Sequence, residues 1–295
     1  MRIPIGLTVA AAVSVCAAPA RAQELIAVRA GRLVDVDHGR ILHDQLVLVR
    51  GEKIEAVQPW PARPPAGARV IDLTHATVAP GLIDCHTHLV DDIQSADVLA
   101  PLKRSGAQQV MIGVRQARAT LLAGFTTVRD VGTYRAFVDV ALRDAINDGT
   151  VIGPRMAVAG AYITTSTGGG EVTGMAPDVT LPAAFRVGVA NSPDEVREKV
   201  RILIHGGADL IKVIATGAVL TSGTKPGAAE FTEEELRAAV DEAGKYGVFV
   251  AAHAHGAEGI KAAVRAGARD LISPPPGLPA DRRPCTPPRS SSRTP

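Results

Sequence analysis

Two histidines with one residue between them follow an apolar run near residue 80. The segment reads Pro80-Gly81-Leu82-Ile83-Asp84-Cys85-His86-Thr87-His88. The apolar start predicts a buried strand, in which residues two apart face the same side. His86 and His88 therefore project together at the C-terminal end of this strand, where two imidazoles can supply half of a divalent-metal site. A His-x-His pair is common by chance, so the prediction depends on the apolar strand before it.

A lysine lies inside a second apolar run, Leu210-Ile211-Lys212-Val213-Ile214. A charged ammonium is costly in such surroundings, and burial lowers the pKa of a lysine and favours the neutral amine. A neutral amine can react with carbon dioxide to give a carbamate, an anionic ligand able to bridge two metal ions. The alternative is a lysine whose ammonium reaches solvent at the strand end. Residue spacing alone leaves both interpretations open for Lys212.

A second histidine pair, His253 and His255, ends the apolar run Val248-Phe249-Val250-Ala251-Ala252. One of the two is a candidate metal ligand, and the other either holds substrate or has a structural role. Tyr162 lies just beyond a predicted strand at 156–159 and is a candidate for substrate contact. Surface or structural roles are predicted for the other histidines, which are His38, His43, His75 and His205.

Strands that alternate with helices must position these residues from about residue 77 onward. Helices are predicted at 107–123, at 134–148, from Ser192, from Thr232 and at 257–266. Two of them begin with capping boxes, because Ser192 is followed by Glu195 and Thr232 by Glu235. Alternation of this kind indicates βαβ units and a parallel sheet. A barrel and an open, doubly wound sheet both satisfy the pattern.

Residues 24–80 have a different pattern of short, alternating runs separated by turn residues. Predicted strands include Leu25–Val28 and Leu33–Val36, with a turn at Gly31 between them. Several short strands of this kind predict a small N-terminal β-sandwich lobe at 23–79.

The first 22 residues are predicted to be a secretory signal peptide. A positive start at Arg2 precedes an apolar run, and Ala20-Arg21-Ala22 is a small-x-small cleavage site. The mature protein is therefore expected in the periplasm or secreted, with no stable membrane anchor after cleavage. The formal net charge is +2 with no basic stripe, which excludes nucleic acid as an expected partner.

Three motifs in combination resemble the amidohydrolase superfamily. They read VAPGLIDCHTHL, GADLIKVIATGAV and VAAHAHGAEGIKAAVRAGA, and the resemblance covers about residues 25–269. It is greatest to the imidazolonepropionase-like branch that includes Xaa-Pro and Xaa-Arg/Lys dipeptidases. The resemblance implies an α/β fold, a (β/α)8 TIM-type barrel beside a small β-sandwich lobe. It also implies that His86 and His88 bind one metal ion, that Lys212 is a carboxylated bridging ligand, and that His253 binds a second metal ion.

The implied activity is hydrolysis of an amide or peptide bond, with a dipeptide as the expected substrate. The resemblance implies two divalent ions, zinc by expectation, and a metal-bridged hydroxide as the attacking group. His255 and Tyr162 are the candidate substrate-binding residues. Two alternatives remain: a hydrolase of a cyclic amide such as an imidazolone or a lactam, and an inactive fragment. A small-molecule or dipeptide partner is expected, and a homo-oligomer is left open.

The sequence departs from the family after Ala268. The family's next strand carries Ile-Glu-His-Gly with a further metal-ligating histidine, whereas this chain continues Arg269-Asp270-Leu271-Ile272-Ser273 with no later histidine. Residues 271–295 form a Pro/Arg/Ser-rich tail that is expected to be disordered. We expect a frameshift or premature end, an incomplete barrel of about five to six strands at 80–270, and impaired activity. The aspartate that the family places after its eighth strand is absent, so the catalytic residue is unknown.

Overall fold

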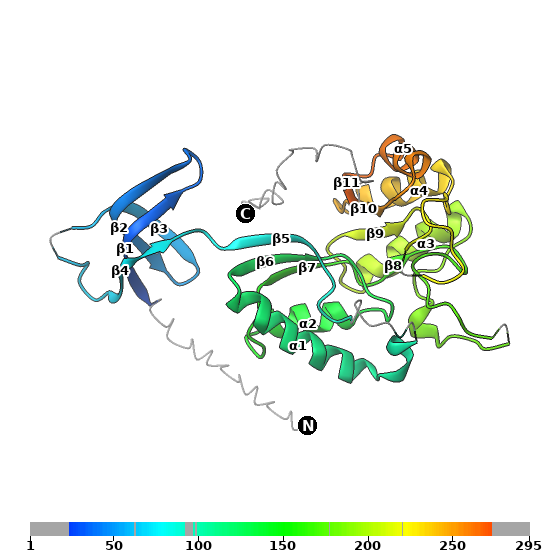
Figure 1. The fold of residues 1–295 in the computed structure, drawn as a ribbon, viewed down its shortest axis with the longest axis horizontal. Coiled ribbons are helices and arrows are strands. Elements are labelled where there is room, and N and C mark those ends of the chain that lie inside the picture. Colours follow the sequence, from blue (N-terminus) through cyan, green and yellow to red (C-terminus); the bar gives the residue numbers. More distant parts are fainter. Residues whose placement is uncertain are drawn as a thin grey trace, which may run out of the picture. The chain divides into compact units, whose positions relative to one another are not determined.

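A computed structural model describes residues 24–272 except 62, 92–96, 98, 177 and 220. The predicted signal peptide and nearly all of the predicted tail lie outside the described residues. The chain divides into two compact units, residues 1–80 and 81–295, which are described separately (Figure 1). Within the described residues, no helix has the length and apolar character needed to cross a membrane.

The described residues of the first unit form a single four-stranded sheet with the order β3-β2-β1-β4. Strands β1 and β2 pair antiparallel, as do β2 and β3, whereas β1 and β4 are parallel. A small core of Ala30, Leu33 and Val47 covers one region of the sheet. The β-sandwich lobe was predicted here, and a second sheet is not found among the described residues of this unit. The strands are β1 (Leu25–Asp35), β2 (Arg40–Arg50), β3 (Lys53–Pro59) and β4 (Arg69–Val78).

The turn predicted at Gly31 is wrong, because β1 continues through this residue. The register with β4 shifts between Ala30 and Arg32, which marks a bulge. A Cβ atom on Gly31 would lie 1.8 Å from the carbonyl oxygen of Thr74. Glycine is therefore needed for close approach of two strands and not for chain reversal.

The described part of the second unit has an α/β fold with seven parallel strands in two sheets. The first sheet has the order β5-β6-β7 and the second the order β11-β10-β9-β8. Asp209 joins the sheets, since its backbone N–H donates to the Val158 carbonyl at 2.8 Å and its carboxylate accepts from the Val158 N–H at 3.0 Å. The strands are β5 (Leu82–Thr87), β6 (Phe125–Asp130), β7 (Arg155–Val158), β8 (Tyr162–Ile163), β9 (Ile211–Ile214), β10 (Val250–His253) and β11 (Asp270–Ile272).

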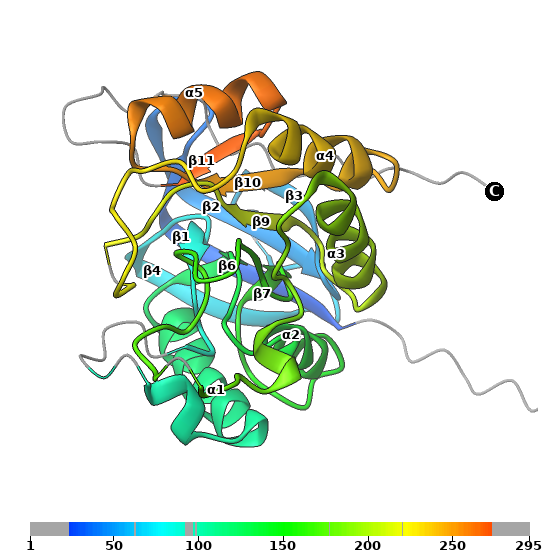
Figure 2. The same cartoon turned by 90° about the vertical axis from the view of Figure 1, so that its right-hand side faces the viewer.

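Helices lie along the outer side of these strands (Figure 2). One apolar cluster joins α1 and α2 to the first sheet, and a larger one joins α3, α4 and α5 to the second. A separate small apolar cluster includes Ala159, Leu210 and Ala251. The helices are α1 (Gly106–Leu122), α2 (Val138–Asn147), α3 (Pro193–His205), α4 (Glu233–Gly244) and α5 (Ala257–Ala266), with short 3-10 turns at η1 (Ala100–Lys103) and η2 (Ala183–Phe185).

Local signals determine where these helices begin. Thr232 and Glu235 form both bonds of the predicted capping box. Ser192 accepts from the Glu195 N–H as predicted, but the Glu195 carboxylate accepts from the backbone N–H of Asn191 and not from that of Ser192.

Helix α2 begins four residues later than predicted. Phe137 has a left-handed backbone with φ of 67°, and its N–H bonds the Gly160 carbonyl at 2.7 Å, so the helix begins after it.

Candidate functional site

The first histidine pair lies at the end of β5. His86 and His88 point toward one another, with 3.2 Å between their Nε2 atoms and 5.2 Å between their ring centroids. His86 is the more exposed of the two. Loss of hydration lowers the pKa of His86 to about 4 and that of His88 to about 3. Both imidazoles are therefore neutral near pH 7, the protonation state in which histidine binds a metal ion.

The second nitrogen of His88 is held by the loop after β6. Its Nδ1 lies 2.8 Å from the carbonyl oxygen of Gly132. A carbonyl oxygen only accepts hydrogen bonds, so Nδ1 carries the ring proton and Nε2 presents its lone pair. A backbone carbonyl in this position is the usual orienting partner of a metal-ligating histidine.

Lys212 lies in the middle of β9, a strand whose four residues are all buried. The side chain is 1% exposed, so its ammonium does not reach solvent at the strand end. Burial is the main cause that lowers the Lys212 pKa to about 7, while Asp270 raises it and Arg129 lowers it further. A large fraction of the amine is therefore neutral near pH 7 and able to react with carbon dioxide.

The second histidine pair follows β10, which lies beside β9. Ala251 is paired with Lys212, and His253 with Ile214, in the parallel register. The Nε2 atom of His253 is buried and has no hydrogen-bond partner among the described residues. Burial lowers the pKa of His253 to about 3, with the Lys212 charge as the next cause. His255 packs edge-on against His253, with 4.5 Å between the ring centroids.

Three of the four histidines are electrostatically coupled to Lys212. Its charge lowers the pKa of His86, of His88 and of His253, so all three rings lie within electrostatic reach of it. Over the described ranges, no three side chains of histidine, cysteine, aspartate or glutamate could hold a metal ion together. A lysine-derived ligand between the pairs would complete the donor set. The unpartnered nitrogen of His253 and the oriented lone pair of His88 fit divalent metal ions that accept nitrogen and oxygen ligands.

The sequence predictions missed an ion pair between the two sheets. Arg129 of β6 donates to the carboxylate of Asp270 at the start of β11. The guanidinium also donates to the Cys85 carbonyl at 2.8 Å and lies over the Phe249 ring. The available signal was an arginine, Arg129, inside a predicted strand. The sequence could not identify Asp270 as the partner of Arg129, because the two lie 141 positions apart.

Three buried carboxylates near the histidine pair were also missed. Asp91 accepts from Gln109 and Thr133, and burial raises its pKa to about 7. Burial likewise raises the pKa of Asp139 to about 6 and that of Asp130 well above its usual value. Asp130 accepts from the Leu89 N–H with one oxygen, while its other oxygen has no partner among the described residues. A weak signal for this cluster was the position of Asp130 at the end of β6 and of Asp91 four residues after the end of β5.

Tyr162 lies in β8 and is 8% exposed. Its hydroxyl is 3.0 Å from Nδ1 of His88, and its ring packs edge-on against that imidazole. Both of these contacts are with a candidate metal ligand. Substrate contact by Tyr162 stays a prediction.

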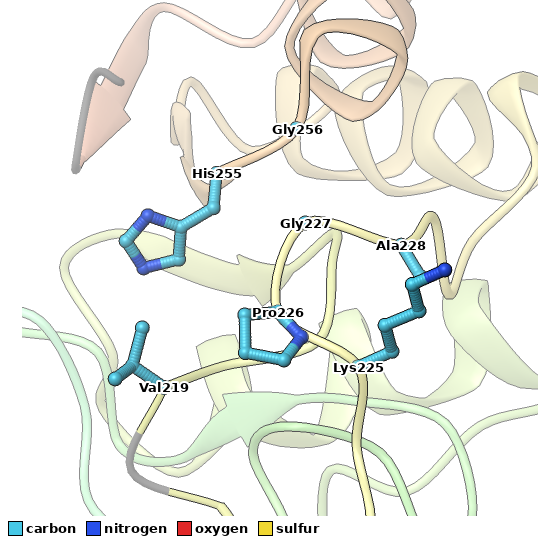
Figure 3. A pocket seen from close by; sticks show the side chains of 7 residues that line it. All are labelled: Val219, Lys225, Pro226, Gly227, Ala228, His255 and Gly256. Carbon is cyan, nitrogen blue, oxygen red and sulfur yellow. The ribbon is translucent and has the colours of Figure 1, made fainter. Parts of the chain in front are cut away.

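A pocket of about 450 Å³ lies beside the second histidine pair (Figure 3). Val219, Pro226 and the His255 ring lie near one another, and the Lys225 side chain extends away from them. The remaining lining residues are Gly227, Ala228 and Gly256. His255, which lines the pocket, also packs on His253, so one ring contact separates the pocket from this candidate metal ligand.

A model of the amidohydrolase family matches residues 77–275, which include both histidine pairs and Lys212. The chain belongs to the amidohydrolase family. A crystal structure of a Xaa-Pro dipeptidase with bound methionine is similar, at 36% identity and a TM-score of 0.77, over 84% of this chain and 61% of that one.

Two curated relatives extend the comparison of this amidohydrolase. Ochratoxinase from Aspergillus niger is 33% identical over 260 residues, and its crystal structure gives a TM-score of 0.70. The match covers 82% of this chain and 52% of ochratoxinase, so the chain spans about half the length of that relative. Imidazolonepropionase from Aliivibrio fischeri is 42% identical over 55 residues, which are 18% of this chain and 14% of that enzyme.

Proposed function

We propose that this amidohydrolase hydrolyses the amide bond of a dipeptide with the help of two divalent metal ions, zinc by preference. The observation that carries the proposal is the convergence of neutral imidazoles on one buried lysine of low pKa. His86 and His88 would hold one ion, His253 the other, and a carboxylated Lys212 would lie between them. We also infer that the two parallel sheets are part of a (β/α)8-type barrel, in which side chains at the C-terminal ends of strands form the active site.

The residues present have separate roles in this proposal. Divalent ions at this position would lower the pKa of bound water and polarise a substrate carbonyl. Gly132 fixes the tautomer of His88, and burial keeps His253 neutral, so neither imidazole must lose a proton before it binds a metal ion. Burial of Lys212 favours the neutral amine that carboxylation requires. The group that protonates the leaving amine is not assigned among the residues described.

The pocket beside His255 supports a small substrate with an apolar side chain. Its volume lies within the range of small-molecule sites. Val219 is 68% exposed and Pro226 lies beside it, so both leave apolar surface for a substrate to cover. The similarity to a Xaa-Pro dipeptidase favours a dipeptide over a larger peptide. We therefore propose a dipeptide with an apolar residue or proline next to the scissile bond.

The experiment is a hydrolysis assay of the chain with zinc and bicarbonate against a dipeptide panel. Apolar and proline-containing dipeptides should be cleaved, dipeptides of two charged residues should be cleaved more slowly, and a chelator should abolish turnover. The matched control is His205→Gln, which changes an exposed helical histidine. Absence of stoichiometric zinc binding, or turnover that a chelator leaves unchanged, would overturn the proposal.

A second candidate function is hydrolysis of a cyclic amide. The observation in its favour is the similarity of 55 residues to imidazolonepropionase. The same assay distinguishes the two when the panel includes an imidazolone and a lactam. Turnover of a cyclic amide without cleavage of any dipeptide would favour this candidate over the first.

A further inference from the structure

Tyr162 lies between two candidate metal ligands, since it contacts His88 and is the strand neighbour of Lys212. It is one of the two residues of β8, the strand that begins the second sheet. In the parallel register Tyr162 is paired with Lys212, so both side chains project from the same face of that sheet. The Tyr162 hydroxyl, however, lies 3.0 Å from His88, which follows the first sheet. The Tyr162 hydroxyl thus links His88, which follows β5 of the first sheet, to the strand beside Lys212 in the second sheet.

The direction of this hydrogen bond follows from the neighbouring carbonyl. Nδ1 of His88 is 2.8 Å from the Gly132 oxygen and 3.0 Å from the Tyr162 oxygen. If the hydroxyl donated to an unprotonated Nδ1, the Gly132 oxygen would face a nitrogen lone pair at short range. The carbonyl therefore requires a proton on Nδ1, and the tyrosine oxygen accepts from the same N–H.

Close packing holds the tyrosine in this position. Gly132 has φ of 109°, and a Cβ atom there would lie 2.7 Å from the Tyr162 ring. Only glycine allows the loop after β6 to present its carbonyl while the ring remains in contact. Tyr134 also packs edge-on against the Tyr162 ring, with 5.3 Å between the ring centroids. The Tyr162 ring therefore has little freedom to turn its hydroxyl away from His88.

We propose that Tyr162 is a positioning residue that, together with Gly132, orients His88 and fixes it relative to Lys212 for metal binding. The inference rests on the proposed metal-dependent function. The hydroxyl gives Nδ1 a second acceptor, which makes the opposite nitrogen a better ligand. It also sets the spacing between ligands that come from different sheets. Loss of such an orienting contact is expected to weaken metal affinity by about tenfold, the lower end of the usual range, because the Gly132 carbonyl remains.

The experiment compares zinc affinity of the full chain, its Tyr162→Phe variant and a matched control, Tyr134→Phe. Tyr134 is half-buried and packs on Tyr162, and its hydroxyl has Thr221 as a side-chain partner. Zinc affinity is measured by competition with a chromophoric chelator, and stability of the metal-free proteins by urea unfolding. We expect Y162F to bind zinc about tenfold more weakly than wild type and Y134F within about twofold, with similar stability for the two variants.

Equal zinc affinity of Y162F and Y134F would overturn the inference while leaving the proposed function standing. Failure of the wild-type chain to bind zinc would instead overturn the proposed function. A further measurement needs no variant: nitrogen NMR of the His88 ring in the metal-free wild-type protein. We expect a neutral ring protonated at Nδ1, with slow exchange of that proton. A ring protonated at Nε2 would contradict the role assigned to Tyr162 even if Y162F does not fold.

Discussion

Replacement of Lys212 by methionine should have opposite effects on stability and on metal binding. The side chain is 1% exposed, and burial lowers its pKa from 10.5 to about 7. A shift of this size corresponds to about 5 kcal/mol at about 1.4 kcal/mol per pKa unit. At pH 7 the folded lysine is about half protonated and the unfolded lysine almost fully, so loss of the charge costs about 4 kcal/mol.

The direction in which this cost changes with pH follows from proton binding. The unfolded chain binds more protons than the folded chain between pH 7 and pH 10.5, so this cost diminishes as the pH rises through that window. Methionine has a similar length and no charge. Without metal, K212M should therefore be more stable than wild type by up to about 4 kcal/mol at pH 7, and by about 3 kcal/mol less than that at pH 9.5.

Urea unfolding in the presence of a chelator at both pH values measures this difference. The matched control is Lys261→Met, an exposed helical lysine paired with Glu258, where a change below about 1 kcal/mol is expected. With zinc present the order should reverse, because wild type gains stability from bound metal and K212M lacks the bridging ligand. The reasoning would be refuted if K212M were less stable than wild type at pH 7 without metal, or if it retained the wild-type zinc content.

Three further outcomes are expected. Replacement of His253 by glutamine should lower the zinc content by one ion per chain in metal analysis, whereas His205→Gln should leave it unchanged; full zinc content in the His253 variant would argue against a second ion there. Burial raises the pKa of Asp91 to about 7, so the folded chain loses stability as the pH rises from about 4 to 7. In urea unfolding, Asp91→Asn should reduce the slope of this loss by about 1.4 kcal/mol per pH unit. An unaltered slope would mean that Asp91 is ionised throughout that window. Addition of zinc should raise the melting temperature of wild type and a chelator should reverse the increase, while a melting temperature indifferent to zinc would contradict a specific site.

The sequence predicted local structure where a local signal was sufficient. Apolar runs at 156–159, 210–214 and 248–252 identified β7, β9 and β10, whereas the two-residue strand β8 at Tyr162 was not predicted. Thr232 with Glu235 fixed the start of α4 through bonds within one turn. Predictions failed where distant residues decide the conformation. Gly31 lies inside a strand because Thr74 approaches it from β4, and α2 starts late because Phe137 bonds Gly160.

For the candidate site, the sequence by itself determined which residues stand at strand ends and which chemistry they could perform. His86 and His88 share one side of a strand by its period of two, and an apolar run around Lys212 predicts its burial. Tertiary structure decided the partners: Gly132 and Tyr162 on His88, Asp270 on Arg129, and the carboxylates buried near Asp130. The reason is that a residue's spacing records its own face and burial, whereas a hydrogen bond between sheets depends on how separate strands come together in the folded chain.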